Sequence, residues 1–227
     1  CLDALLDQTV PRDTYEVIFV DDASTDDTAH RVRRYPDVRL IALPENRWAA
    51  AARNAGLQEA RGEIILFTDA DCIPARDWIE KMLKPFQEAE IAGAKGIYRT
   101  RQRSLVARFA QLEYESRYDI MRRQRYIDFI DTYSAGYRRE VLLRHGGFDP
   151  SFRIDEDQEL SFRLTEAGYK LAFNPEAVVY HHHPETLQRY LKRKYDIGFW
   201  KAFVLSRHPR KAVSDSHTPQ GLKAELG

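Results

Sequence analysis

The sequence has few cysteines and no long apolar run, and these two absences exclude several classes of protein. Cys1 and Cys72 are its only cysteines among 227 residues. They are too few for the disulfide framework of a small secreted domain and lack the spacing of a zinc site. No apolar run approaches the roughly 18 residues that cross a bilayer. A reducing compartment, the cytoplasm, is therefore our default expectation.

The start of the chain lacks both an initiator methionine and a signal peptide. It opens instead inside a segment, residues 2–8, with the pattern of a helix. We therefore expect the chain to be truncated at its N-terminus.

An excess of charge of either sign is also lacking, because 35 Lys and Arg balance 35 Asp and Glu. The zero net charge and the lack of a recognition motif argue against a nucleic-acid partner. The balance hides an asymmetry: residues 1–90 hold 11 basic and 18 acidic side chains, a net charge of −7, which leaves +7 for residues 91–227. An apolar fraction of 43% is enough for a globular fold with a sizeable core.

Two short apolar runs, residues 17–20 and 63–68, are each followed closely by a pair of acids. Both runs have the pattern of buried strands, and their alternation with helices indicates an α/β protein with a parallel sheet covered on both faces. Ligands of such sheets bind beyond the carboxyl ends of the strands. We therefore expect four carboxylates at one rim of the sheet, those of Asp21, Asp22, Asp69 and Asp71.

The second pair of acids, Asp69 and Asp71, favours a divalent cation. Two ionised carboxylates roughly 5 Å apart repel by about 3 kcal/mol at an effective dielectric constant of about 20. A cation that also holds phosphates would remove this cost. The alternative is that the two acids cap a loop and the helix after Pro74.

The remaining pattern predicts further helices and strands along most of the chain. An amphipathic helix carries Leu105, Phe109 and Leu112 on one face, and another helix carries Leu160, Leu164 and Ala167 on one stripe. The other predicted elements are helices over residues 48–60, 75–90 and 185–205 and strands over residues 38–43, 94–99 and 177–182.

Five motifs, in the same order and spacing, resemble those of the family-2 glycosyltransferases of the GT-A fold. The resemblance covers roughly residues 1–205, although the family's first strand has no counterpart before Cys1. It implies a Rossmann-like, mostly parallel sheet flanked by helices, with a fused acceptor-side subdomain. We expect a nucleotide-sugar-binding half over residues 1–100, an acceptor-binding half over 101–205 and a tail over 206–227. The motifs are Val20-Asp21-Asp22-Ala23-Ser24-Thr25-Asp26, Ala52-Arg53-Asn54-Ala55-Gly56, Asp69-Ala70-Asp71, Gly146-Gly147-Phe148-Asp149 with Glu156-Asp157-Gln158-Glu159-Leu160, and Val178-Val179-Tyr180-His181.

The resemblance implies an inverting transfer of a sugar from a nucleotide diphosphate sugar to a hydroxyl of a glycan or lipid-linked acceptor, dependent on Mg²⁺ or Mn²⁺. Asp71 would ligate the metal directly, with Asp69 near the ribose or the metal's water shell. His181 would complete the ligand set or contact the diphosphate, and the alternative is a structural role. Because adjacent strand residues point to opposite faces, three consecutive histidines cannot easily all bind one ion, and at most one or two of them should face the site.

By the same resemblance, Asp157 is the base that removes the proton of the acceptor hydroxyl. A position near the start of a helix would keep its carboxylate ionised at neutral pH. Glu156 would then contact the acceptor or support the base. The competing interpretation is local, because Asp155 and Gln158 have capping-box spacing.

Four further residues match the donor side of the family's site. Asp22 would accept a hydrogen bond from the nucleotide base, with Asp21 beside it, although an Asx-type turn explains both acids without a ligand. Arg53 and Asn54 would face the nucleotide or hydrogen-bond the neighbouring strand ends.

The Gly146-Gly147 pair suits a loop that approaches the donor sugar closely, and it equally suits the end of a helix. Asp149 would contact the acceptor or form a turn. Both interpretations stay open for these residues.

Two basic stretches, residues 99–125 and the helix over residues 185–205, are solvated faces by default. The second interleaves cations with aromatic side chains, which also suits a diphosphate or a membrane interface. Peripheral association with the inner face of the cell membrane is therefore a further expectation. The oligomeric state is not indicated by the sequence.

Two rival functions belong to other classes. A sugar-nucleotide nucleotidyltransferase also places acids and a metal on such a sheet, but its Gly-rich phosphate loop with Arg and Lys is not visible here. A non-catalytic nucleotide-sugar-binding module would bind the donor without transferring the sugar.

Overall fold

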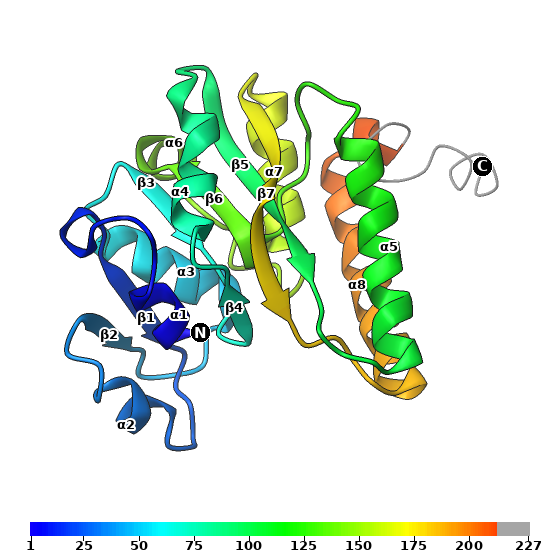
Figure 1. Cartoon of the computed structure of the whole chain (residues 1–227). Helices are drawn as coiled ribbons and strands as arrows, with labels where there is room; N and C mark the ends of the chain where they lie inside the picture. The colour runs from blue at the N-terminus through cyan, green and yellow to red at the C-terminus, as the bar shows by residue number, and fades with distance from the viewer. Residues whose placement is uncertain (213–227) are drawn as a thin grey trace.

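The computed structural model describes residues 1–212, in which the strands form two sheets (Figure 1). The smaller sheet pairs β1 (Val17–Asp21) with β2 (Val38–Ala42) in parallel. Residues 213–227, most of the predicted tail, lie outside the described residues. The larger sheet has the order β3 (Ile64–Phe67), β6 (Ala135–Arg138), β5 (Ile91–Arg99), β7 (Lys170–His181) and β4 (Cys72–Pro74).

In the larger sheet β3, β5 and β7 run in one direction, whereas β6 and β4 run against them. The predicted α/β class is present, and β1, β2, β3, β5 and β7 lie where the apolar runs place strands. The two reversed strands have four and three residues. Such short strands show too little alternation for the sequence to reveal them.

The helices are distributed along the whole described chain, and α4 differs most in length from its predicted range, residues 75–90. None of them is long and apolar enough to cross a membrane within the described residues. Short 3₁₀ turns occupy Arg12–Thr14, Lys84–Gln87, Thr132–Ser134 and Pro209–Ala212. The helices are α1 (Leu2–Leu6), α2 (Thr28–Val32), α3 (Trp48–Glu59), α4 (Trp78–Leu83), α5 (Leu105–Met121), α6 (Arg139–Arg144), α7 (Glu156–Glu166) and α8 (Leu187–Arg207).

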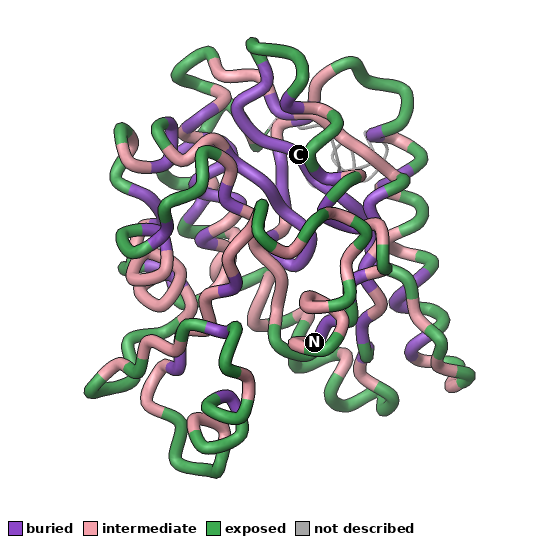
Figure 2. Tube along the Cα trace, turned by 60° about the vertical axis from the view of Figure 1, so that its left-hand side comes forward, coloured by how far each residue is buried: buried purple, intermediate pink, exposed green. Residues whose placement is uncertain are grey.

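Two hydrophobic clusters cover the two faces of the larger sheet. The first joins α3, α7 and the end of α5 through residues such as Leu57, Leu160 and Met121. The second is built on α4, whose Trp78 and Met82 are buried. Figure 2 shows the buried residues concentrated along the strands between these layers. At about 1.5–3 kcal/mol for each large apolar side chain, this burial holds the rim of the sheet in place.

The two sheets are not joined by a hydrogen-bonded ladder within the described residues. A largely apolar cavity of about 550 Å³ lies between β1 and β3 and is lined by residues of both strands and of α3. Side chains bridge the two strands at one end, where the Arg61 N–H donates to the Glu16 carboxylate at 2.7 Å. Because Glu16 precedes β1 and Arg61 precedes β3, this contact holds the amino ends of the two strands together.

The α5 and α8 helices lie side by side and project beyond the sheet (Figure 1). The Phe109 ring contacts the Tyr190 ring, with centroids 5.7 Å apart, and one turn further along both helices Lys194 pairs with Glu113 at 2.9 Å, so the two helices run in the same direction. The Leu105, Phe109 and Leu112 side chains, which share one face of α5 as predicted, are each more than half exposed. The opposite face, where small alanines allow close approach, packs on the sheet.

Candidate functional site

The Asp69-Ala70-Asp71 triplet forms the turn between β3 and β4, closed by the Cys72 N–H donating to the Asp69 carbonyl at 3.0 Å. Asp69, Asp71 and Cys72 each place a ligand atom within 4.8 Å of the others. The side chain of Asp71 is 64% exposed and that of Asp69 is 37% exposed. Burial and the two carboxylates raise the pKa of the Cys72 thiol to about 12, so it stays protonated at neutral pH. The two carboxylates are therefore the groups of this turn that could hold a metal ion.

His181 ends β7 directly opposite Cys72 in the β4 pairing, which brings its ring to the triplet. Its Nε2 lies 3.3 Å from Asp71 Oδ2. The hydrogen bond with His181 lowers the pKa of Asp71. His181 and His183 are buried and His182 is exposed, which is the alternation expected of a strand. Two carboxylates and one imidazole form a donor set that fits Mn²⁺ or Mg²⁺.

Arg53 of α3 connects the triplet to the start of α7. Its guanidinium donates to Asp69 at 3.1 Å and also pairs with Glu156. The side chain of Arg53 is 16% exposed and that of Glu156 is 8% exposed. Burial alone would lower the pKa of Arg53, but the two carboxylates raise it. The predicted donor-side and acceptor-side acids thus share one buried cation.

Asp157 lies in the first turn of α7 and is half-buried. Its Oδ1 accepts from the Gln158 N–H at 2.8 Å and its Oδ2 from the Thr132 N–H at 3.2 Å. Burial and the nearby Glu156 and Asp131 raise its pKa well above the usual range. This direction is opposite to the one expected from the start of a helix, because burial and the clustered acids outweigh the helix dipole.

Asp155 does not form the predicted capping box. Its φ of +63° is left-handed, and its side chain accepts no hydrogen bond from the start of α7. One carboxylate oxygen is buried without a hydrogen-bond partner among the described residues. Burial and Glu156 raise the pKa of Asp155 to about 7. The capping interpretation of this acidic cluster is therefore wrong.

Asp21 and Asp22 serve the loops that follow β1 and β2. The Asp21 side chain is buried and accepts from the Ser24 N–H at 3.1 Å. Asp22 accepts from the Arg47 N–H at 2.8 Å. None of the described hydrogen bonds links this pair to Asp69 or the rest of the triplet. The contact of Asp21 supports the turn interpretation. Asp21 is the last residue of β1 and Asp22 is the first residue of the loop that follows it.

Asn54 holds the loop that contains the two glycines. Its amide donates to the Phe148 carbonyl at 2.7 Å and accepts from the Phe148 N–H at 2.9 Å. Gly146 and Gly147 have φ values of +76° and +69° and end α6, with the Gly147 N–H donating to Leu142. A Cβ on Gly147 would lie 2.3 Å from Asn54 Oδ1. These contacts agree with the helix-ending interpretation of the pair.

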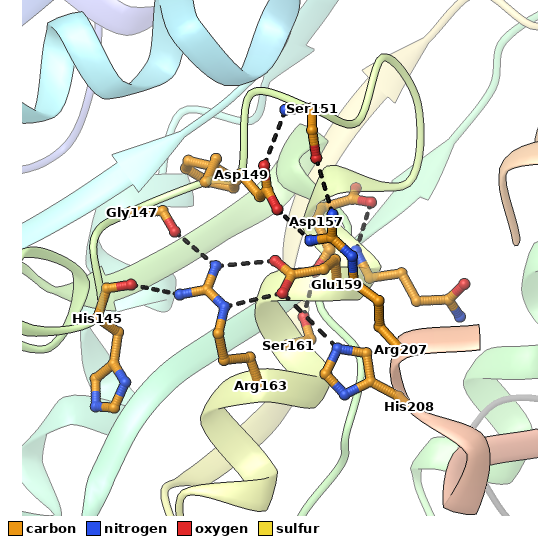
Figure 3. Close-up of polar contacts among 12 residues, drawn as sticks. His145, Gly147, Asp149, Ser151, Asp157, Glu159, Ser161, Arg163, Arg207 and His208 are labelled. Atoms are coloured by element: carbon orange, nitrogen blue, oxygen red, sulfur yellow. Dashed lines mark hydrogen bonds and ion pairs between the residues drawn. The ribbon is translucent and has the colours of Figure 1, made fainter. Parts of the chain in front are cut away.

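A second clamp fastens the same loop from α7 (Figure 3). The Arg163 guanidinium donates to the carbonyls of His145 and Gly147. Its Nη2 and Nε also donate to the two carboxylate oxygens of Glu159, at 2.8 and 2.9 Å. Beyond it, Asp149 accepts from the Ser151 N–H at 2.9 Å, as expected of a turn. It also pairs with Arg207 at the end of α8. The glycine loop is therefore tied to three helices.

Sequence reasoning missed the partners that α5 and α8 bring to the triplet. His183 and Gln111 lie behind His181, with His183 Nε2 at 3.1 Å from Gln111 Oε1. Burial would lower the pKa of Arg193, but Tyr114 and other acidic groups, Asp71 among them, raise it. Arg193 belongs to the basic stretch predicted over residues 185–205, but the sequence could not show that this cation lies within electrostatic reach of the triplet.

The family model described as "Glycosyl transferase family 2" matches residues 1–146. A pre-mycofactocin glycosyltransferase of Mycobacterium tuberculosis is 30% identical over 210 residues, which are 87% of this chain and 44% of that protein. Glycosyltransferase AglE of Haloferax volcanii is 28% identical over 214 residues, 87% of this chain and 66% of that protein. The chain therefore spans about half to two thirds of the length of these relatives.

Solved structures show the same fold. A mannosyltransferase of Pyrobaculum calidifontis in complex with GDP-Man and Mn²⁺ superimposes with a TM-score of 0.70 at 28% identity, covering 98% of this chain and 62% of that chain. TarS of S. aureus in complex with UDP superimposes with a TM-score of 0.64 at 17% identity, covering 98% of this chain and 63% of that chain, a likeness of fold alone. The predicted GT-A fold is confirmed.

Proposed function

Because this chain belongs to glycosyl transferase family 2, we propose that it transfers a sugar from a nucleotide diphosphate sugar to a hydroxyl group, with inversion at the anomeric carbon. One observation carries the proposal. Arg53 joins Asp69 of the acid triplet to Glu156, which directly precedes Asp157. A cation-binding group and a proton acceptor therefore lie on either side of one buried guanidinium, as a transfer between donor and acceptor requires.

The donor end of the site is built on the triplet and His181. Asp71, with Asp69 and His181, would hold Mg²⁺ or Mn²⁺, which when bound stabilises the negative charge on the departing diphosphate. The mannosyltransferase that shares this fold was solved with GDP-Man and Mn²⁺, which supports a nucleotide-sugar donor and a divalent metal here. Asp22 would accept a hydrogen bond from the nucleotide base, next to the turn that Asp21 closes.

Asp157 would act at the acceptor end as the general base. The acceptor oxygen forms a bond to the anomeric carbon, the bond to the diphosphate breaks with its electron pair, and Asp157 takes the hydroxyl proton. The raised pKa of Asp157 makes it a stronger base once ionised. Two backbone N–H groups, those of Gln158 and Thr132, fix the direction of its carboxylate.

The other predicted site residues would support these two ends. Arg53 and Glu156 would hold the triplet and the base at a constant separation, and Asn54 would hold the loop of Gly146 and Gly147 against the donor sugar. Asp149, next to that loop, would contact the acceptor.

Replacement of Asp157 tests the proposal directly. We expect Asp157→Asn to abolish sugar transfer in an assay with labelled nucleotide sugars and glycan or lipid-linked acceptors, while donor binding by calorimetry is retained. Asp155→Asn is the matched control, because it removes a neighbouring buried acid and should keep transfer. Undiminished transfer by Asp157→Asn would contradict the assignment, and donor binding by the parent chain without transfer to any acceptor would favour a non-catalytic module.

We further propose that the acceptor lies at a membrane with anionic lipids, at its cytoplasmic face. Exposed apolar side chains recur every four residues on α8, next to those of α5, and basic residues flank them. The chain should therefore sediment together with anionic vesicles, and added salt should weaken this binding. It should not sediment with neutral vesicles. Tyr195→Asp should reduce binding and Leu83→Asp on α4 should not. The stripe consists of Leu187, Leu191, Tyr195, Phe199 and Phe203.

A further inference from the structure

A row of three buried polar side chains runs from α5 to the acid triplet. Gln111 Oε1 lies 3.1 Å from His183 Nε2, and His183 Nδ1 lies 3.3 Å from His181 Nδ1. The far side of the His181 ring, its Nε2, lies 3.3 Å from Asp71 Oδ2. Each of the three residues is less than 9% exposed. The row therefore links a helix behind the sheet to the carboxylate expected to bind the metal.

The orientation of the Gln111 amide follows from its other contacts. Its Nε2 donates to the Tyr98 carbonyl at 3.1 Å and to the Glu115 carboxylate at 3.2 Å. Reversing the amide would turn its oxygen toward these two acceptors and remove the donor that Gln111 supplies to each of them. The amide oxygen of Gln111 therefore faces His183 and accepts a hydrogen bond from its Nε2–H.

His183 consequently presents a lone pair at Nδ1. Its ring nitrogens contact the Gln111 oxygen and the His181 ring among the described residues, with no carboxylate to hold a second proton, so the ring is a neutral imidazole with one proton. That proton is on Nε2, where Gln111 accepts it. The hydrogen between the two Nδ1 atoms must then come from His181.

Aromatic stacking fixes the planes of both rings. Tyr98 stacks on His181 with centroids 4.5 Å apart and an interplanar angle of 23°. Tyr114 stacks on His183 with centroids 5.6 Å apart and an angle of 17°. Stacking therefore fixes the two ring planes, and the contacts of the ring nitrogens set which way each ring faces within its plane.

We propose that Gln111 and His183 are positioning residues that keep a proton on Nδ1 of His181, so that Nε2, which faces Asp71 and donates to it without a metal, is the ring atom at which a divalent cation would replace a proton. The proposal rests on the proposed metal site. Histidines that bind metals are commonly oriented through their second ring nitrogen in this way. Here the orienting group is an imidazole that is itself oriented by an amide on another helix.

A matched pair of variants isolates the hydrogen bond from the packing. Asparagine and leucine have nearly the same shape, and both remove the stacking of His183 on Tyr114. His183→Asn keeps an oxygen that can accept from His181 Nδ1–H, whereas His183→Leu removes every acceptor. We expect the Mn²⁺ affinity of His183→Leu to fall about 10- to 100-fold and that of His183→Asn to stay within about threefold of the parent. Gln111→Leu should weaken Mn²⁺ binding in the same direction.

Electron paramagnetic resonance of free Mn²⁺ measures these affinities without any transfer assay. Equal losses in His183→Leu and His183→Asn would overturn the proposal, because packing alone would then explain them. Asp71→Asn tests the metal site itself: if this change and the parent chain both show no Mn²⁺ binding, the proposed metal site fails.

Even if the chain does not bind Mn²⁺, the position of the ring proton of His181 tests whether Gln111 and His183 orient this ring. Protonated and unprotonated ring nitrogens give well-separated ¹⁵N chemical shifts, so long-range ¹H–¹⁵N spectra identify the atom that carries the proton. We expect His181 Nδ1 to be protonated with and without Mg²⁺, and to lose this preference in His183→Leu. An unprotonated Nδ1 in the parent chain would overturn the proposal.

Discussion

Removal of the Arg53 guanidinium should destabilise the whole protein, because it leaves a buried carboxylate without a partner. Arg53→Met keeps most of the length and volume of the side chain and removes the charge. Glu156, which is 8% exposed, then loses the cation with which it pairs in the described part of the chain, whereas Asp69, 37% exposed, is still reached by water. Loss of one partner of a buried ion pair typically costs 3–5 kcal/mol.

We expect Arg53→Met to lower the free energy of unfolding by about 3 kcal/mol, the low end of that range, since Asp69 is partly solvated. For a chain of this size the melting temperature should fall by roughly 6–12 °C. Urea denaturation followed by circular dichroism measures the first quantity and calorimetry the second.

A double-mutant cycle with Glu156→Gln separates the ion pair from the packing. Glu156→Gln in the Arg53→Met background should recover about 2 kcal/mol of the free energy of unfolding, because it removes the buried charge that Arg53→Met leaves without a partner. A single Arg53→Met change that costs less than about 0.5 kcal/mol would refute the reasoning. So would a cycle in which the two substitutions are additive.

Two further predictions concern backbone strain and pH. Gly147→Ala should cost at least about 1 kcal/mol more than Gly146→Ala, because both have left-handed φ but only at Gly147 would a Cβ meet Asn54 Oδ1, at 2.3 Å; equal costs from urea denaturation would contradict this. The pKa of Asp155, about 7 in the folded state, lies above its unfolded value, so its contribution to stability is present below about pH 4 and is lost as pH rises through 7. Relative to the parent chain, Asp155→Asn should therefore gain about 2 kcal/mol between pH 4.5 and 8, and a constant difference would contradict the raised pKa.

The parts of the site that could be predicted from the sequence depend on local pattern. The alternation of apolar runs and acids placed Asp69 and Asp71 in a turn after a strand. The period of two along a strand predicted that His181 and His182 point to opposite faces, as they do. Both inferences need only residues close together in the chain, where backbone geometry fixes the direction of side chains.

The parts that could not be predicted depend on contacts between distant residues. Arg53 and Glu156 are 103 positions apart, and nothing near either residue indicates their pairing. The raised pKa of Asp157 likewise comes partly from Asp131, which another segment brings to it. The left-handed φ of Asp155 also escaped prediction, since its spacing to the next residues resembles that of a regular cap.

The measurement that tests the central claim most directly is thermal unfolding with nucleotide diphosphates and nucleotide sugars, with and without Mn²⁺. A ligand that binds only the folded state at 100 times its Kd stabilises it by about 2.7 kcal/mol, or roughly 5–11 °C in melting temperature for this chain length. We expect such a shift with one nucleotide class, in the presence of Mn²⁺, and its loss in Asp71→Asn. Identical melting temperatures with every nucleotide, with and without Mn²⁺, would contradict a metal-dependent donor site at Asp69 and Asp71.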